Sequence, residues 1–297
     1  MIIEMNKAHR SQSRADKTAP LVSISCITFN HEGYIAQAID SFLMQKTIFP
    51  IEILIHDDAS TDNTSNIIKE YETKYPEILK PIYETVNQWS KGKRGSAVFN
   101  FPRVRGKYIA LCEGDDYWTD PYKLQKQVGF LEDNSKAIMV AHRAFKVTAA
   151  GQKISIFPGI QKDLLDPKNI IENGGDYFAT NSILFRRQLI TNIPKWFYRF
   201  PVGDTAINNL AIQRGEIGFI NEVMSAYRKG VPNSWSSTIH NPKIKIIHEY
   251  RYALAYSKLL VFETKYRPYY IKIIIIKGIK IIKHLLKITI KKIACKK

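Results

Sequence analysis

Two segments near the start of the chain show the order of a strand, a polar loop and an amphipathic helix. Residues 21–29 are apolar and rich in β-branched side chains, and residues 34–45 place apolar side chains at i, i+3 and i+4. Residues 51–55 and 64–75 repeat this order, and Pro76 marks the end of the second helix. The alternation predicts an α/β fold with a mostly parallel, doubly wound sheet flanked by helices.

Further elements are predicted downstream. Residues 108–112 read as another strand, residues 137–147 are strand-like, and residues 204–213 are helix-like. No internal repeat or long linker interrupts residues 21–240, so we expect one domain there, preceded by a polar segment at residues 1–20.

The C-terminal segment, residues 241–297, is predicted to be a helical, basic tail. The net charge is +17, but eleven of the 44 Lys and Arg residues and no acid lie in residues 264–297, so the rest of the chain carries only +6. At about 100° per residue the lysines share one helical face and aliphatic side chains line the rest. The two sets are Lys277, Lys280, Lys283, Lys287 and Lys291, and Ile279, Ile282, Leu286, Ile290 and Ile293.

This tail is interrupted by lysine too often for a transmembrane helix. A lysine face opposite an aliphatic face is typical of an interfacial helix on an anionic membrane surface. Two alternatives are an amphipathic helix packed on the body of the protein and a strand over residues 271–276. A nucleic-acid partner is not expected, because the tail has few aromatic residues and no recognisable reading motif.

The cysteines and the N-terminus bear on the compartment. Cys26, Cys112 and Cys295 are far apart and lack the spacing of a zinc site or redox pair. Residues 1–20 lack the apolar stretch of a signal peptide. We therefore expect a cytoplasmic protein, peripheral on the inner face of the cell membrane.

Acidic residues follow two of the predicted strands. Asp57 and Asp58 come after the second strand, and Glu113, Asp115 and Asp116 come after the strand at 108–112. Ligands of open α/β sheets bind outside the carboxyl ends of the strands, so both clusters can face one site. Such oxygen ligands suit Mg²⁺ or Mn²⁺ completed by substrate phosphates and water. A solvated turn is the alternative from spacing alone.

Three blocks of sequence resemble family 2 glycosyltransferases of the GT-A fold: VSISCITFNHEGYIAQAIDSFLMQ, EILIHDDASTDNT and GKYIALCEGDDYWTDPYKLQKQ. The resemblance covers residues 21–130 strongly and continues more loosely to residue 240. It implies a GT-A-like, nucleotide-binding mixed sheet flanked by helices, here with a C-terminal amphipathic helix. It also implies an inverting, metal-dependent transferase of hexosyl or N-acetylhexosaminyl groups. The expected donor is a UDP-sugar, and the acceptor is a glycan or lipid-linked saccharide of cell-surface polysaccharide synthesis.

The resemblance assigns the donor's base and ribose to the first strand and its loop. It implies contacts at Ile27, Thr28 and Asn30, followed by Asp57 and Asp58, with Asp58 at the uracil. The alternative for these Asn and Asp side chains is capping of the helices that follow.

The metal is assigned by resemblance to Asp115 and Asp116, as Mn²⁺ or Mg²⁺. Glu113 stands where many relatives have Asp, and it is given a ribose or outer role. Asn87 and Arg94 are expected to help hold the donor, although their segment reads equally well as a surface loop.

Asp204 is the candidate base, because the resemblance places the base at the start of a helix after the metal motif and an acceptor hydroxyl must lose its proton. Many relatives have a second acid directly before it, where this chain has Gly203. Capping of the helix is the alternative role. Asn181, Ser182 and Trp235 are expected on the acceptor side.

Two other functions compete with a transferase. The departures at Glu113 and before Asp204 are hints of a non-catalytic, membrane-associated scaffold with the same fold. A nucleotidyltransferase would show a Gly-rich, basic phosphate loop after the first strand, which TFNHEGYI lacks. His31 and His56 have no partner at metal-ligand spacing and are expected outside the site.

Overall fold

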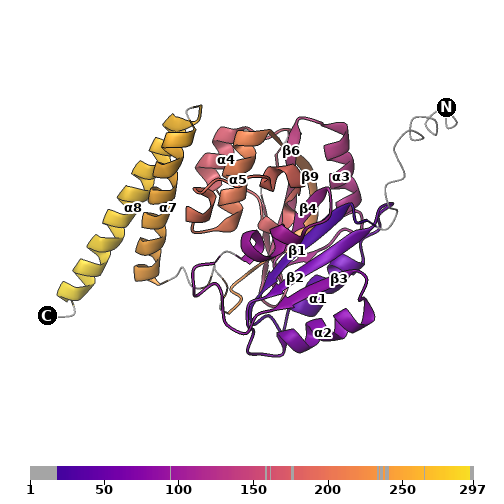
Figure 1. Cartoon of the computed structure of the whole chain (residues 1–297). Helices are drawn as coiled ribbons and strands as arrows, with labels where there is room; N and C mark the ends of the chain where they lie inside the picture. The colour runs from indigo at the N-terminus through magenta and orange to yellow at the C-terminus, as the bar shows by residue number, and fades with distance from the viewer. Residues whose placement is uncertain are drawn as a thin grey trace.

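The computed structural model describes residues 19–93, 95–157, 159–160, 162–174, 177–232, 234, 237, 241–263 and 265–294, with only the backbone from residue 287 onward (Figure 1). The strands are β1 (Val22–Thr28), β2 (Ile51–Asp57), β3 (Leu79–Tyr83), β4 (Tyr108–Leu111), β5 (Tyr117–Trp118), β6 (Ala137–Thr148), β7 (Lys153–Ile156), β8 (Leu184–Arg186) and β9 (Glu216–Lys229). The helices are α1 (Ile35–Leu43), α2 (Thr64–Lys74), α3 (Lys123–Asp133), α4 (Pro167–Asn173), α5 (Gly203–Arg214), α7 (Pro242–Phe262) and α8 (Arg267–Ala294).

The described strands form one mixed sheet in the order β3-β2-β1-β4-β8-β6-β9-β5, with β7 paired to β6. The first half is parallel, because α1 and α2 return the chain to the same end of the sheet between strands. β8 is antiparallel to both β4 and β6, whereas β6 and β9 run parallel. The mixed sheet flanked by helices agrees with the predicted α/β class.

Both faces of the sheet are buried, and alternation along β4 shows how the two cores divide. Tyr108 and Ala110 pack into one apolar cluster with α1, α2 and α3, whereas Ile109 and Leu111 pack into the other with α4, α5, α7 and α8. Side chains that alternate along a strand reach opposite faces. The helices therefore cover the sheet in two layers (Figure 1).

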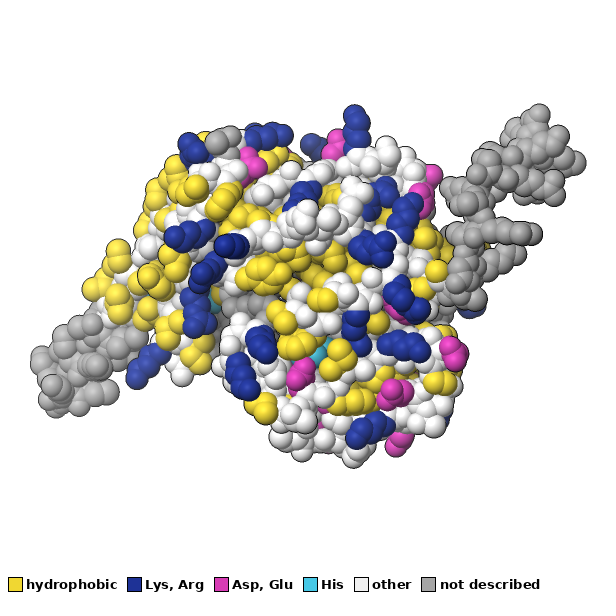
Figure 2. Space-filling model, in the orientation of Figure 1, with side chains coloured by type: hydrophobic (Ala, Val, Ile, Leu, Met, Phe, Trp, Pro, Cys, Tyr) yellow, Lys and Arg dark blue, Asp and Glu magenta, His cyan; other side chains and the backbone are white. Residues whose placement is uncertain are grey.

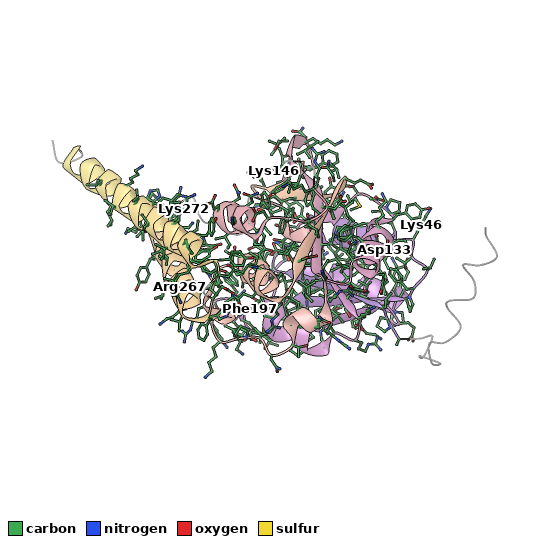
Figure 3. The ribbon with its side chains drawn as sticks, turned by 90° about the horizontal axis from the view of Figure 1, so that it is seen from above. Lys46, Asp133, Lys146, Phe197, Arg267 and Lys272 are labelled. Carbon is green, nitrogen blue, oxygen red and sulfur yellow. The ribbon has the colours of Figure 1, made fainter. Side chains whose placement is uncertain are left out.

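The two C-terminal helices, α7 and α8, pack into the apolar cluster that contains Ile109 and Leu111. Tyr256 of α7 and Tyr270 of α8 are fully buried, and the Tyr256 ring lies 5.2 Å from that of Phe200. Lys272 of α8, which Figure 3 labels, also pairs with Glu172 of α4 at 2.5 Å. The strand alternative for residues 271–276 is wrong, because this segment lies inside α8.

Candidate active site

The two acidic clusters meet at one edge of the sheet. β1 and β2 pair in parallel so that Thr28 lies beside Asp57, and β4 flanks β1 on its other side. The turn after β4 lies directly on the end of β1, with the Gly114 amide donating to the Ile27 carbonyl at 2.9 Å. A Cβ on Gly114 would lie 2.7 Å from Thr28 Oγ1, so glycine permits this close approach.

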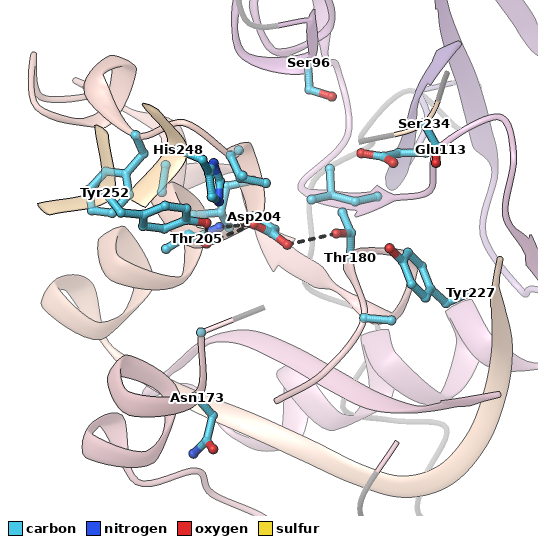
Figure 4. A pocket seen from close by; sticks show the side chains of 18 of the residues that line it. Ser96, Glu113, Asn173, Thr180, Asp204, Thr205, Tyr227, Ser234, His248 and Tyr252 are labelled. Atoms are coloured by element: carbon cyan, nitrogen blue, oxygen red, sulfur yellow. Dashed lines mark hydrogen bonds between the residues drawn. The ribbon is translucent and has the colours of Figure 1, made fainter. Parts of the chain in front are cut away.

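A cleft of about 840 Å³ opens at this edge. Glu113 and Asp115 line it from the turn after β4, and Asp204 lines it from the first turn of α5. Figure 4 shows Asp204 and Glu113 projecting toward the same space, with Thr180 between them. α7 and α8 complete the wall, so the C-terminal helices are part of the cleft.

The cleft carboxylates repel one another. Burial, together with the smaller effects of the negative charges of Asp115 and Asp204, raises the pKa of Glu113 to about 8. His31 Nε2 lies 4.0 Å from Asp115 Oδ2, and Nδ1 of the same ring lies 3.1 Å from Thr28 Oγ1. A cation between these carboxylates would relieve their repulsion.

Asp116 is turned away from the cleft and holds two other segments. Its Oδ1 accepts the backbone N–H of Arg228 at 2.8 Å, and its Oδ2 accepts Asn181 Nδ2 at 3.0 Å. Asp116 is only 1% exposed and does not line the cleft, whereas its neighbour Asp115 does. The two carboxylates predicted to bind the metal together thus occupy different environments.

The predicted acceptor residues Asn181 and Ser182 lie beneath the cleft. Asn181 Oδ1 accepts Ser225 Oγ at 2.7 Å, and Ser182 Oγ donates to the carbonyl of Ala179 at 2.6 Å. Both residues are fully buried, and it is the preceding Ala179 and Thr180 that line the cleft. Trp235, the third predicted acceptor residue, lies outside the described residues.

On the donor side, Asp58 organises the loop after β3. Its Oδ1 accepts the Gln88 amide at 2.6 Å and its Oδ2 accepts the Trp89 amide at 3.0 Å. Asn87 supports the same loop by donating from Nδ2 to the Asp58 carbonyl at 3.1 Å. These bonds bring Trp89 to the cleft. Arg94 lies outside the described residues.

Asn30 and Asp57 tie the first two loops together. Asn30 has a positive φ of 55°, its amide donates to Ser60 Oγ at 2.9 Å, and its Oδ1 accepts the Thr61 amide at 2.8 Å. Asp57 accepts the hydroxyls of Ser60 and Ser65. Neither side chain caps α1 or α2. Of the residues in the first two loops that were assigned to base and ribose, Ile27 lines the cleft.

Asp204 is held by hydroxyl donors. Thr180 Oγ1 donates to its Oδ2 at 3.3 Å, and the amide and hydroxyl of Thr205 both approach its Oδ1, the hydroxyl at 3.1 Å (Figure 4). Thr205 Oγ1 also lies 3.0 Å from the hydroxyl of Tyr252 on α7. Val202 occupies the N-cap position, so Asp204 is not the cap of α5.

His31, which was expected outside the site, and Arg228 both contact Asp115 of the acidic turn. The Arg228 guanidinium lies over the rings of Tyr34 and Tyr117, at 5.0 Å and 4.6 Å, and its Nη1 donates to the Asp115 carbonyl at 2.5 Å. A cation over aromatic faces is fixed in position. No spacing in the sequence relates either residue to the acidic turn, because their partners lie far along the chain.

The cleft residues fit a divalent cation held mainly by its substrate. Among the described residues no group of three His, Cys, Asp or Glu side chains is arranged to hold a metal. Asp115 and Glu113 remain as two carboxylates facing the cleft. Mg²⁺ often binds through one or two carboxylates and completes its coordination with phosphates and water.

The chain is similar to several known proteins. Residues 23–190 match the family described as Glycosyl transferase family 2. An uncharacterised protein of Mycobacterium tuberculosis is 37% identical over 227 residues, covering 73% of this chain and 61% of that protein. A UDP-Glc:α-D-GlcNAc-diphosphoundecaprenol β-1,3-glucosyltransferase of Escherichia coli is 35% identical over 112 residues, covering 38% of this chain and 41% of that enzyme. The chain thus spans less than two thirds of these relatives.

Two solved structures share the fold. Residues 1–349 of Staphylococcus aureus TarS, crystallised with UDP-GlcNAc, superpose with a TM-score of 0.65 at 19% identity, covering 85% of this chain and 70% of that one. A mannosyltransferase of Pyrobaculum calidifontis, in complex with GDP-Man and Mn²⁺, superposes with a TM-score of 0.58 at 16% identity, covering 99% of this chain and 83% of that one.

Proposed function

The chain belongs to glycosyl transferase family 2, and from this premise we propose that it is an inverting, metal-dependent transferase of cell-surface polysaccharide synthesis. It moves a sugar from a nucleotide-sugar, most simply a UDP-sugar, to a glycan or lipid-linked saccharide. The observation that carries the proposal is the convergence of Glu113, Asp115 and Asp204 on one cleft from two separate elements.

Each side of the cleft has a separate task. The nucleotide lies at the ends of β1 and β2, near Ile27 and Trp89, and Asp58 keeps the Trp89 loop in place. Asp115 and Glu113 would hold Mn²⁺ or Mg²⁺, which would offset negative charge on the departing diphosphate. The sequence resemblance assigns Asp116 to the metal as well, but its hydrogen bonds favour a role in holding Asn181 and Arg228 in position.

Asp204 is the base in this scheme. Its carboxylate accepts the proton of the acceptor hydroxyl as that oxygen bonds to the anomeric carbon, and the bond from this carbon to the phosphate oxygen breaks with its electron pair leaving on the nucleoside diphosphate. Thr180 and Thr205 orient the carboxylate through hydrogen bonds.

The C-terminal helices support a location at a membrane surface. Among the described helices, none is both long enough and apolar enough to cross a bilayer. The outward face of α8 nevertheless exposes Ile275, Ile279, Ile282 and Leu286, each about half exposed. Exposed apolar side chains beside lysines are typical of helices that lie in the headgroup region. We therefore assign the protein a peripheral position on an anionic membrane, on the cytoplasmic side.

Thermal-shift titration tests the donor and the metal together. A ligand that binds only the folded state raises its apparent stability. We expect a shift with UDP-sugars that requires Mn²⁺ and is lost in Asp115→Asn. Lack of a shift with UDP-, dTDP- and GDP-sugars up to millimolar concentration would instead favour a scaffold that has lost turnover.

A further inference from the structure

A second, smaller hollow lies where α7 and α8 come together. It measures about 320 Å³ and is lined by Lys245 of α7 and by Lys280, Lys283 and His284 of α8. We call it the basic hollow. No acidic side chain lines it among the described residues, and none of its four residues forms an ion pair with a described residue. Like charges this close repel one another, and an anion would offset the repulsion.

The basic hollow and the active-site cleft share a lining residue. Lys280 lines both, and Lys277, one turn earlier on α8, lines the cleft. Lys277 Nζ lies 4.6 Å from the ring of Tyr252, whose hydroxyl is 3.0 Å from Thr205 Oγ1 beside Asp204. Three residues of helix span about 4.5 Å, so the basic hollow begins one helical turn beyond this chain of contacts.

The position of the basic hollow relative to the apolar face indicates where an anion would come from. At about 100° per residue, Ile275, Ile279, Ile282 and Leu286 share one side of α8, whereas Lys280 and His284 face the opposite side. Figure 2 shows hydrophobic side chains exposed over the two C-terminal helices and Lys or Arg side chains along their border with the body. With the apolar stripe in a bilayer, the basic hollow sits at headgroup level, facing the cleft.

We propose that the basic hollow binds the diphosphate of a lipid-linked saccharide acceptor, so that α8 presents the sugar end of this acceptor to Asp204. The proposal rests on the proposed transferase function. It follows from three features together: a hollow lined by cations, Lys280 lining both this hollow and the cleft, and an apolar stripe that would bring the hollow to a membrane surface. A lone phospholipid headgroup accounts for the charge but not for the path to Asp204.

Binding measurements on the full chain test the proposal without the donor. Farnesyl diphosphate is titrated calorimetrically in the presence of EDTA, which removes metal from the donor site, and farnesol and inorganic pyrophosphate serve as comparison probes. The variant Lys245→Gln/Lys280→Gln/Lys283→Gln is compared with Lys69→Gln/Lys74→Gln/Lys136→Gln, which removes the same charge from exposed positions on the body. The single variant Lys280→Gln covers the case in which the triple variant folds poorly.

We expect farnesyl diphosphate to bind the wild type and the control variant equally, and the basic-hollow variant at least tenfold more weakly, with a smaller loss for Lys280→Gln. Pyrophosphate should bind more weakly than farnesyl diphosphate. The affinity for farnesol should be the same in the wild type and in the lysine variants. Equal affinities in the two triple variants would overturn the proposal. The proposal would also be overturned if the basic-hollow variant bound farnesyl diphosphate as the wild type does but no longer bound phosphatidylglycerol vesicles. That result would identify a site for lipid headgroups.

Because no donor or metal is present, this result is independent of turnover. A protein that never transfers sugar can still pass the binding test. A working transferase whose acceptor lacks a diphosphate fails it while still releasing UDP.

Discussion

Replacing Lys123 by methionine is expected to stabilise the protein at neutral pH. Lys123 is fully buried, with its Nζ 2.8 Å from Gln127 Oε1 and 4.0 Å from the centre of the Trp118 ring. Burial lowers the pKa of Lys123 from 10.5 to about 7. The unfolded chain therefore holds a proton between pH 7 and 10.5 that the folded protein has largely released, so the lysine costs most at low pH and least at high pH.

The magnitude follows from the shift. At 1.36 kcal/mol per unit, the lysine costs the folded state about 4 kcal/mol at pH 7 and about 1.5 kcal/mol at pH 9.5. Methionine keeps the contact with Trp118 but leaves Gln127 Oε1 without this donor. The lost hydrogen bond destabilises the variant by roughly 1–3 kcal/mol. A net gain of about 1–3 kcal/mol at pH 7 remains by this reckoning.

Urea unfolding at pH 7 and pH 9.5, followed by tryptophan fluorescence, measures both values. The stability difference between Lys123→Met and wild type should fall by about 3 kcal/mol over this interval. Lys136→Met, at an exposed lysine, controls for general effects of charge and should show no such change. A difference that does not depend on pH would refute the reasoning, because the buried ammonium would then not be its cause.

Three further predictions concern the site and its frame. Asp204→Asn should lower turnover by about 10²–10⁴-fold, typical of a lost general base, while leaving the donor-induced thermal shift in place. Asp115→Asn should abolish the Mn²⁺-dependent shift at nearly unchanged stability, whereas Asp116→Asn should cost about 1–3 kcal/mol in urea unfolding, because its amide would face a buried donor; the reverse pattern would exchange their roles. A Cβ on Gly106 would lie 2.7 Å from a backbone nitrogen of β1. Gly106→Ala should therefore cost about 1–3 kcal/mol, while Gly129→Ala in the open interior of α3 should gain about 0.5–1 kcal/mol; equal effects of the two would contradict the steric argument.

The central strands of the sheet were predicted correctly because burial on both faces leaves a continuous apolar run in the sequence. Residues 22–28, 51–57 and 108–111 are strands buried on both faces, and each reads as a short apolar run. β9 was not predicted, because Asn221 and Glu222 break its apolar pattern where its pairing with β6 shifts register. The pattern within a strand shows its burial but not an irregularity imposed by a neighbour.

The site was predictable to the level of the acidic turns but not to the level of single side chains. Asp115 and Asp116 are adjacent in sequence and look equivalent there. Only the folded structure shows that Asp116 accepts hydrogen bonds from Asn181 and from Arg228 of β9. His31 approaches Asp115 across 84 positions of chain, a contact that exists only after the sheet has formed. The family resemblance was confirmed by the match to residues 23–190.

Release of UDP from UDP-sugars, with and without Mn²⁺, tests the central claim most directly. The wild type should release UDP from at least one UDP-sugar only when Mn²⁺ is present, and EDTA or Asp115→Asn should abolish the release. Lys136 is exposed and does not line the cleft, so Lys136→Met serves as the matched control and should retain the activity. Release that persists in Asp115→Asn, or absence of release from UDP-, dTDP- and GDP-sugars alike, would contradict a metal-dependent transferase site in this cleft.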